Sequence, residues 1–137
     1  MTVVNVPDFI SFSDVDLLKA LVASDRRPNL LVDCQRELSG DLVRQLAGLC
    51  SPACQEVVIP GPLDLPGDEC RTLLLHDVSK LTLQQQLTMS DWLRYRRRDT
   101  QVVSITTQPL ILQVREGRFL EGLFYRLNTI SISAMGR

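Results

Sequence analysis

Apolar residues along this chain fall into two kinds of pattern. Five short runs are nearly continuous in apolar residues, which is typical of strands that are buried on both faces of a sheet. These runs cover residues 29–32, 56–59, 72–75, 101–105 and 130–132. Between them, apolar residues recur every third or fourth position, which predicts amphipathic helices. The helical segments cover residues 13–22, 39–49, 81–97, 110–114 and 119–127.

The alternation of strands and helices predicts the fold class. Successive strand–helix–strand units form right-handed crossovers, so we expect an α/β fold with a mostly parallel five-stranded sheet and helices on both faces. The 137 residues suit a single domain, in which residues 1–12 form an N-terminal extension. Residues 60–70 contain three prolines, two glycines and three acidic residues, which predict a loop.

Composition narrows the range of functions. Hydrophobic residues make up 45% of the chain, which is enough for a folded core. The 15 basic and 16 acidic residues leave a net charge of −1, which gives no general attraction to nucleic acid or to an anionic membrane. The sequence has no signal peptide and no run of about 20 apolar residues, so we expect a cytoplasmic protein without membrane contact.

One short segment of the chain is strongly basic. The segment Arg94-Tyr-Arg-Arg-Arg98 places four arginines at the end of a predicted helix, where they could contact phosphates. Cations at this position also interact favourably with the helix dipole, and Asp91 and Asp99 flank the cluster. We therefore expect a solvated helix end, and we do not expect direct nucleic-acid binding.

The cysteines do not form a recognisable metal motif. Cys50 and Cys54 could form half of a zinc site, but such a site needs a second close pair or histidines. The other cysteines, Cys34 and Cys70, are isolated in sequence, and His76 is the only histidine. We expect reduced thiols that pack as small apolar groups, with neither a metal site nor a catalytic cysteine.

Polar residues follow three of the predicted strands. In an open parallel sheet, ligands bind outside the carboxyl ends of the strands. Asp33 follows the first strand, His76 and Asp77 follow the third, and Thr106 and Thr107 follow the fourth. Asp77 could hold a metal–nucleotide complex or polarise a water molecule. It could instead cap the turn into the next helix, and the residue pattern alone favours this structural role.

Four segments are similar to the AAA+ domain of sigma-54-dependent transcription activators. Thr72-Leu-Leu-Leu-His-Asp-Val78 resembles their Walker B strand, G-T-L-F-L-D-E-I, and Leu81-Thr-Leu-Gln-Gln-Gln86 resembles E-L-P-L-x-x-Q. Val102-Val-Ser-Ile-Thr-Thr107 resembles their sensor strand, V-I-A-A-T-N. Arg115-Glu-Gly-Arg-Phe-Leu-Glu-Gly-Leu-Phe-Tyr-Arg-Leu-Asn128 is similar to E-G-x-F-R-x-D-L-Y-Y-R-L-N. The segments keep the family's order within residues 71–132, so the resemblance implies a truncated P-loop NTPase-like core.

The phosphate-binding motif of that family is missing. A P-loop has the pattern G-x-x-x-x-G-K-S/T because glycine amides surround the phosphates and the lysine neutralises them. The corresponding segment, residues 33–40, reads D-C-Q-R-E-L-S-G, and no glycine in the chain precedes a lysine. Asp33 and Glu37 occupy the region where phosphate charge would arrive. Like charges repel in a confined site, so we do not expect tight ATP binding.

The resemblance also implies that the residues for ATP hydrolysis are altered. His76 takes the place of the metal-supporting aspartate, and Asp77 takes the place of the water-activating glutamate. Thr107 replaces the sensor asparagine, and Leu120 replaces the first arginine finger, whereas Arg126 matches the second. Since Mg²⁺ prefers oxygen ligands, we expect no catalytic residues, no bound metal or other cofactor, and the properties of a pseudo-ATPase.

Two larger parts of the family are also expected to be absent. The G-A-F-T-G-A insertion that contacts the sigma factor has no counterpart within residues 51–70. The sequence ends at Arg137, so we expect neither a helical lid nor a DNA-binding helix-turn-helix. The resemblance therefore implies a bacterial domain that keeps the core fold of the family without its ATP-hydrolysis residues.

Two functions follow from these observations. The first is a non-catalytic interaction module in transcription regulation, which binds an AAA+ activator or associates with itself. Arg126 would lie at this interface, unless it only forms a surface ion pair with Glu121 or Asp77.

The second function is a residual ATP-binding domain or ATPase. In that case Asp77, Thr106 and Arg126 would carry the activity, with Ser39 and Gly40 near the phosphates.

Overall fold

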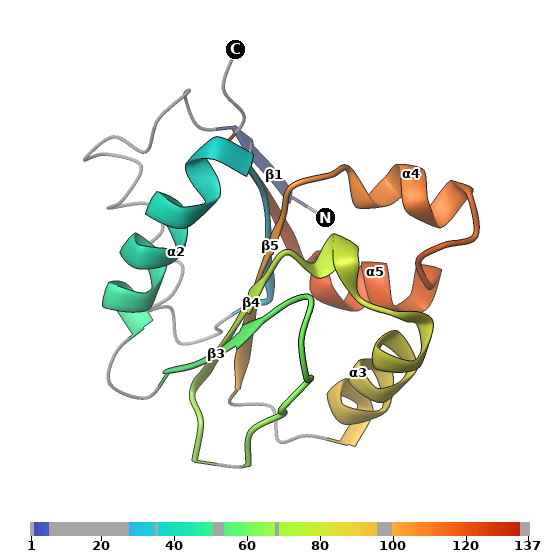
Figure 1. The fold of residues 1–137 in the computed structure, drawn as a ribbon, viewed down its shortest axis with the longest axis horizontal. Coiled ribbons are helices and arrows are strands. Elements are labelled where there is room, and N and C mark those ends of the chain that lie inside the picture. The colour runs from blue at the N-terminus through green and yellow to red at the C-terminus, as the bar shows by residue number, and fades with distance from the viewer. Residues whose placement is uncertain are drawn as a thin grey trace.

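The computed structural model describes residues 2–5, 28–34, 36–50, 54–67, 69–95 and 100–134. The fold, drawn in Figure 1, contains a parallel six-stranded sheet. Its strand order is β1-β6-β2-β5-β4-β3. The strands are β1 (Thr2–Asn5), β2 (Leu30–Cys34), β3 (Cys54–Val58), β4 (Thr72–His76), β5 (Gln101–Thr106) and β6 (Ile130–Ala134). The helices are α2 (Arg36–Cys50), the short 3₁₀ helix η1 (Val78–Lys80), α3 (Leu83–Tyr95), α4 (Leu110–Arg115) and α5 (Glu121–Leu127).

The prediction of an α/β fold with a parallel sheet is confirmed, although the sheet has one strand more than expected. All five predicted strands are present. The sixth, β1, lies in the predicted N-terminal extension and pairs with β6, with Thr2 opposite Ile130. Its four residues include only two apolar side chains, so the local pattern gave little indication of a strand. Pairing with a strand from the other end of the chain defines it.

Two helix boundaries differ from the prediction. The helix expected at residues 39–49 begins earlier, at Arg36, so Ser39 lies within its first turns rather than at its start. The helix expected at residues 81–97 begins slightly later, at Leu83 of α3, and the separate short helix η1 precedes it. Residues 13–22, for which a helix was predicted, and residues 96–98 of the arginine cluster lie outside the described part of the chain.

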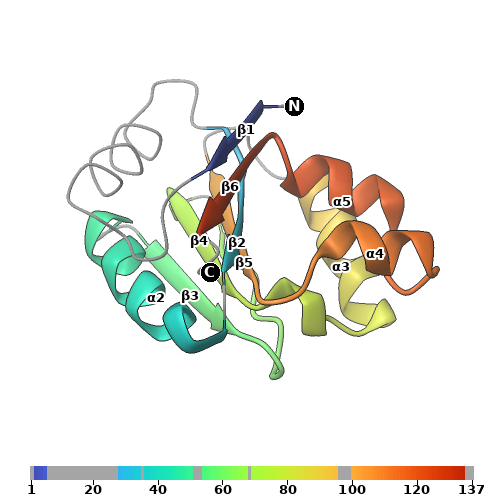
Figure 2. The same ribbon diagram turned by 90° about the horizontal axis from the view of Figure 1, so that it is seen from above.

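Helices cover both faces of the sheet. In Figure 2, α2 lies on one face, and α3, α4 and α5 lie together on the other. Leu42 and Leu46 of α2 pack on the first face of the central strands. Met89 of α3 and Leu123 and Leu127 of α5 pack on the second. The central strand β5 is buried along its whole length, including its polar residues Gln101, Ser104 and Thr106.

The chain connections open a crevice at the carboxyl edge of the sheet. β2 continues into α2 on one face, whereas β5 continues into α4 and α5 on the other (Figure 2). The ends of these neighbouring strands therefore form a topological switch point, where open sheets bind ligands. Asp33 lies opposite Thr106 at this point. No helix in the described ranges is long and apolar enough to cross a membrane.

Candidate functional site at the carboxyl edge of the sheet

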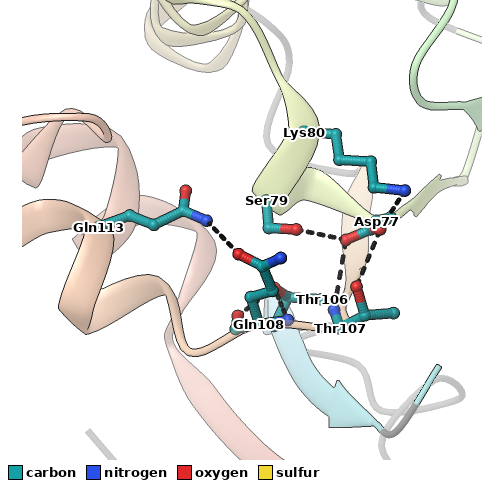
Figure 3. Close-up of polar contacts among 7 residues, drawn as sticks. All are labelled: Asp77, Ser79, Lys80, Thr106, Thr107, Gln108 and Gln113. Carbon is teal, nitrogen blue, oxygen red and sulfur yellow. Dashed lines mark hydrogen bonds and ion pairs between the residues drawn. The ribbon is translucent and has the colours of Figure 1, made fainter.

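Asp77 links the loops that follow β4 and β5. Its backbone is left-handed, with φ 58° and ψ 67°, a conformation that aspartate tolerates better than most residues. One carboxylate oxygen accepts hydrogen bonds from Ser79 Oγ at 2.5 Å and from the Thr107 N–H at 3.2 Å. The other accepts from Thr107 Oγ1 at 2.9 Å and lies 3.5 Å from Lys80 Nζ. Figure 3 shows these groups converging on the carboxylate, which is therefore fully engaged by the protein.

These contacts also set the charge of Asp77. Burial of the carboxylate opposes its ionisation, but hydrogen bonds from Ser79 and Thr107 and the nearby Lys80 ammonium outweigh this effect. Together they lower the pKa of Asp77 below its ordinary value. The carboxylate is thus ionised at neutral pH and is held by donors from the protein itself. Asp77 occupies the N-cap position of η1, but its side chain makes no cap hydrogen bond to the η1 backbone and accepts from the Ser79 hydroxyl instead.

His76 points to a different partner. Its Nε2 lies 3.1 Å from Glu56 Oε1 on the neighbouring strand β3. The register places Val58 opposite His76, so Glu56 lies two residues back along the same face of the sheet. His76 and Asp77 are adjacent in sequence, but each is held by a different element.

A cavity of about 490 Å³ lies between α2 and the ends of β4 and β5, and we refer to it as the α2 cleft. It combines an apolar floor with three cationic side chains and one carboxylate. Its lining residues are Arg36, Gly40, Val43, Arg44, Ile59, His76, Asp77, Lys80, Ile105 and Thr107. Gly40 was predicted to lie near any bound phosphate, and it does line this cleft. The side chain of Ser39 lies outside the described part of the structure.

Asp33 lies on the opposite face from the α2 cleft. Val32 and Cys34 belong to the core under α2, whereas Leu31 belongs to the core under α3, α4 and α5. Because side chains alternate along a strand, Asp33 shares the face of Leu31. Glu37 is exposed on α2, and the charges of both Asp33 and Glu37 act on the Cys34 thiol. The expectation that both residues stand where phosphate charge would arrive stays a prediction.

The environment of Asp33 is partly apolar. Burial of its carboxyl group raises the pKa to about 6. It lines a cavity of about 270 Å³ between β2, α4 and α5, which we call the α4–α5 cleft. It also lines a smaller cavity of about 140 Å³ next to Thr106, Thr107 and Pro109. Asp33 is thus the carboxylate at the switch point of the sheet.

The two threonines after β5 have different roles. Thr106 is buried, and its hydroxyl donates to the carbonyl of Gln108 at 2.5 Å. Gln108 Oε1 in turn accepts a hydrogen bond from Gln113 of α4 at 3.2 Å (Figure 3). Thr106 therefore shapes the turn into α4, while Thr107 binds Asp77. Of the residues predicted to handle nucleotide, Asp77 and Gly40 line the α2 cleft, whereas Thr106 does not. The residue that Asp77 binds is Thr107, at the altered sensor position.

Arg126 is separate from this cluster. It is exposed on α5, and its Nη1 donates to the Ser90 carbonyl of α3 at 3.4 Å. Among the described residues, the ion pair considered with Glu121 or Asp77 does not form. The residue therefore stays accessible on the surface formed by α3 and α5.

Gln86 is a structural residue to which the sequence analysis assigned no role. It is 1% exposed, and its amide nitrogen donates to the carbonyls of Leu81 at 3.1 Å and Arg118 at 3.0 Å. Its Oε1 accepts from the Leu120 N–H at 2.9 Å. Gln86 thus fixes the loop that leads into α5. The available signal was a glutamine at core spacing from Met89, at the last position of the matched E-L-P-L-x-x-Q pattern.

Cysteine thiolates can bind metal ions. In the described ranges, no group of three or more histidine, cysteine, aspartate or glutamate side chains could hold a metal ion. Cys34 and Cys70 are buried, and Cys54 is partly buried. Burial and the charges of Asp33 and Glu37 raise the pKa of Cys34 to about 11. This thiol is protonated, and therefore weakly reactive, at neutral pH.

Comparisons with known proteins agree with the fold and the matched segments. Solved structures of NtrX from Brucella abortus share the α/β fold of this chain. The complex with ATP has a TM-score of 0.63 and 18% identity, covering 89% of this chain and 34% of that chain. The complex with ADP has a TM-score of 0.66 and 18% identity, covering 90% and 35%. This chain thus spans about a third of the length of those proteins.

The family is defined by the second half of the chain. Residues 63–135 match the family described as the Sigma-54 interaction domain. This match spans more than half of the 137 residues, so the chain belongs to that family. The resemblance found in the four sequence segments is therefore confirmed. No curated protein matches the chain.

Proposed function

We propose that this domain is a non-catalytic member of the sigma-54 interaction domain family. It acts as a protein-interaction and regulatory module in bacterial transcription, in the cytoplasm. The observation that carries the proposal is the state of Asp77, whose two carboxylate oxygens are occupied by Ser79, Thr107 and Lys80. The residue in the position of the family's water-activating group therefore joins two loops of the scaffold.

The metal-binding chemistry of an ATPase is also disfavoured by these residues. Mg²⁺ prefers hard oxygen ligands, and a histidine nitrogen stands where the family has a carboxylate. His76 is bonded to Glu56, which lies on β3 rather than near Asp77. For Asp77 to bind a metal ion, it would have to give up hydrogen bonds from Thr107. These are reasons to expect that the altered residues do not support hydrolysis.

The segment after β2 provides no P-loop. A phosphate cradle needs a glycine-rich turn of backbone N–H groups ahead of the helix. Here α2 begins at Arg36, and Gly40 lies within the helix, where its N–H group is part of the helical hydrogen bonding. No lysine follows it, since residue 41 is Asp41. The connection between β2 and α2 is therefore too short to surround a triphosphate.

A residual ATP-binding function is the second candidate, and the α2 cleft is the observation that favours it. Its volume of about 490 Å³ lies within the range of about 300–1,000 Å³ that is typical of small-molecule sites. Arg36, Arg44 and Lys80 give it a cationic lining. However, Arg44 forms an ion pair with Asp41, and Lys80 forms one with Asp77, which reduces the charge available to phosphate.

Isothermal titration calorimetry with Mg-ATP and Mg-ADP separates the two candidates. We expect no saturable heat at nucleotide concentrations up to about 1 mM. A Kd of about 1 mM corresponds to only about 4 kcal/mol of binding free energy. Saturable binding in the micromolar range would overturn the proposal. In that case Lys80→Ala and Arg44→Ala should weaken binding, whereas Gln84→Ala on the exposed surface of α3 should not.

The interaction role is tested separately through Arg126. We propose that this exposed arginine anchors contact with an AAA+ activator or with a second copy of the chain, because arginine is enriched among residues that dominate interfaces. Sedimentation velocity of the protein alone, and mixed with a family ATPase, measures both forms of association. Arg126→Ala should reduce the complex, whereas Arg115→Ala, an exposed arginine on α4, is the matched control.

A further inference from the structure

The α4–α5 cleft is a second cavity, separate from the α2 cleft that is the candidate nucleotide site. It lies on the face of the sheet opposite the α2 cleft, at the carboxyl end of β2, and has a volume of about 270 Å³. Its walls are mainly apolar and include Leu31, Pro109, Ile111, Phe124 and Tyr125. Ile111 and Tyr125 are 36% and 57% exposed, so apolar surface continues from the cleft to the outside.

A single carboxylate lies at the end of this apolar cleft. Asp33 is the acidic residue of the lining, and no hydrogen bond or ion pair joins its carboxylate to another residue that the structure describes. Asp77, by contrast, is bonded at both oxygens. A carboxylate that is partly removed from water without compensation is energetically unfavourable, and a cation placed beside it would relieve this cost.

The size of the cleft indicates what kind of group it can hold. Its volume of about 270 Å³ is below the range of about 300–1,000 Å³ typical of small-molecule sites. It is better suited to one or two side chains of a protein partner. An arginine or a lysine combines an apolar stem with a cationic end, which matches apolar walls beside a carboxylate. A phosphate group would instead be repelled by Asp33.

We propose that the α4–α5 cleft binds a partner-protein segment that places an arginine or lysine against Asp33 and an adjacent aliphatic side chain between Ile111 and Tyr125. This inference rests on the proposed interaction function and names the chemistry of the partner. The cationic group supplies the partner that the Asp33 carboxylate lacks. The aliphatic group covers the exposed apolar surface of α4 and α5. A short basic and apolar motif is therefore the expected recognition element.

Amide ¹H–¹⁵N NMR titration of the whole chain with capped tripeptides tests this proposal. The probe is acetyl-Leu-Arg-Leu-amide, and the matched peptide has Gln in place of Arg. We expect saturable shifts of the Asp33, Ile111 and Tyr125 amides with the Arg peptide only. Asp33→Asn should weaken its binding about tenfold or more, because a charge-assisted contact is lost. Asp41→Asn, on the exposed surface of α2, is the control and should leave binding unchanged.

Three results would overturn the proposal: no saturable shift at about 10 mM peptide, equal binding of the Gln peptide, or unchanged binding to Asp33→Asn. If Asp33→Asn does not fold, Tyr125→Ser provides the same test, because its side chain lies at the exposed rim of the cleft. A parallel titration with Mg-ATP distinguishes failure of the peptide-binding proposal from failure of the proposed non-catalytic function. Shifts at Gly40 and Lys80 with Mg-ATP would contradict the non-catalytic role, whatever the peptide does.

Discussion

The carboxylate of Asp77 binds Thr107 at two points, through the Thr107 N–H at 3.2 Å and its hydroxyl at 2.9 Å. The regular pairing of β4 with β5 ends at Leu75 and Ser104, so this contact continues the connection between the strands beyond the sheet. The side chain of Asp77 is only 14% exposed, which limits competition from water. The contact therefore holds together the two loops at the carboxyl edge.

Replacing Asp77 by alanine is expected to destabilise the fold. The substitution removes charge-assisted hydrogen bonds and leaves the Thr107 N–H without its acceptor, which should lower the free energy of unfolding by about 2–3 kcal/mol. Urea denaturation followed by circular dichroism measures this change. Thr107→Val, which loses only the hydroxyl, should cost about 1 kcal/mol, and Thr107→Ser should be nearly neutral. A stable Asp77→Ala variant would mean that the carboxylate is kept for chemistry rather than for structure.

Gln86 provides a second test of the scaffold. Gln86→Leu keeps an apolar shape in the core but leaves the Arg118 carbonyl and the Leu120 N–H without partners. We expect a loss of about 2–4 kcal/mol in unfolding free energy and faster hydrogen exchange at the Leu120 amide. Gln84→Leu on the exposed side of the same helix is the control, with a change within about 0.5 kcal/mol. Unchanged exchange at Leu120 would contradict the role assigned to Gln86.

The sequence predicted the central strands well because their apolar runs are buried from both sides. Leu73, Leu74 and Leu75 are all fully buried, although they point alternately to the two faces. β1 could not be predicted in the same way, since its position depends on pairing with β6. The local pattern of apolar residues predicts how deeply a strand is buried. The position of an edge strand depends instead on pairing between segments that are distant in sequence.

Part of the candidate site could also be predicted from the sequence. Parallel strands end at the same edge, so Asp77 and Thr107 could be expected as neighbours, and the structure joins them. The face of the sheet on which Asp33 lies could not be inferred from the sequence. β2 has apolar side chains on both faces, and the sequence does not show which helix covers which face. The contact between His76 and Glu56 depends on the register of β3 with β4, which no local pattern reveals.

Cys34 should be the least reactive of the described cysteines. It is 1% exposed, and burial together with Asp33 and Glu37 raises its pKa to about 11, so almost no thiolate forms at neutral pH. In the folded protein, iodoacetamide should modify Cys54 well before Cys34, and urea should remove the difference. Peptide mass mapping after timed alkylation measures both rates. Rapid modification of Cys34 in the native state would contradict the burial of this strand end.

Asp33 should make stability fall as the pH rises through weakly acidic values. The unfolded carboxyl loses its proton near its ordinary pKa of 3.8, whereas the folded one retains it up to about 6 because of burial. Between these values the folded state binds more protons, so the free energy of unfolding decreases with rising pH. The full shift corresponds to about 3 kcal/mol, and solvent screening reduces the expected effect to roughly 1–2 kcal/mol.

Asp33→Asn removes this titration, so its measured stability relative to the wild type should increase from pH 4 to pH 6 and then level off. At pH 7 the variant should be the more stable protein, because it no longer holds an uncompensated carboxylate in the α4–α5 cleft. Urea midpoints at each pH measure the difference. Asp41→Asn, whose side chain is 65% exposed, is the control and should show no such increase. A less stable Asp33→Asn at pH 7 would show that the folded domain already supplies the cation which we assign to a partner.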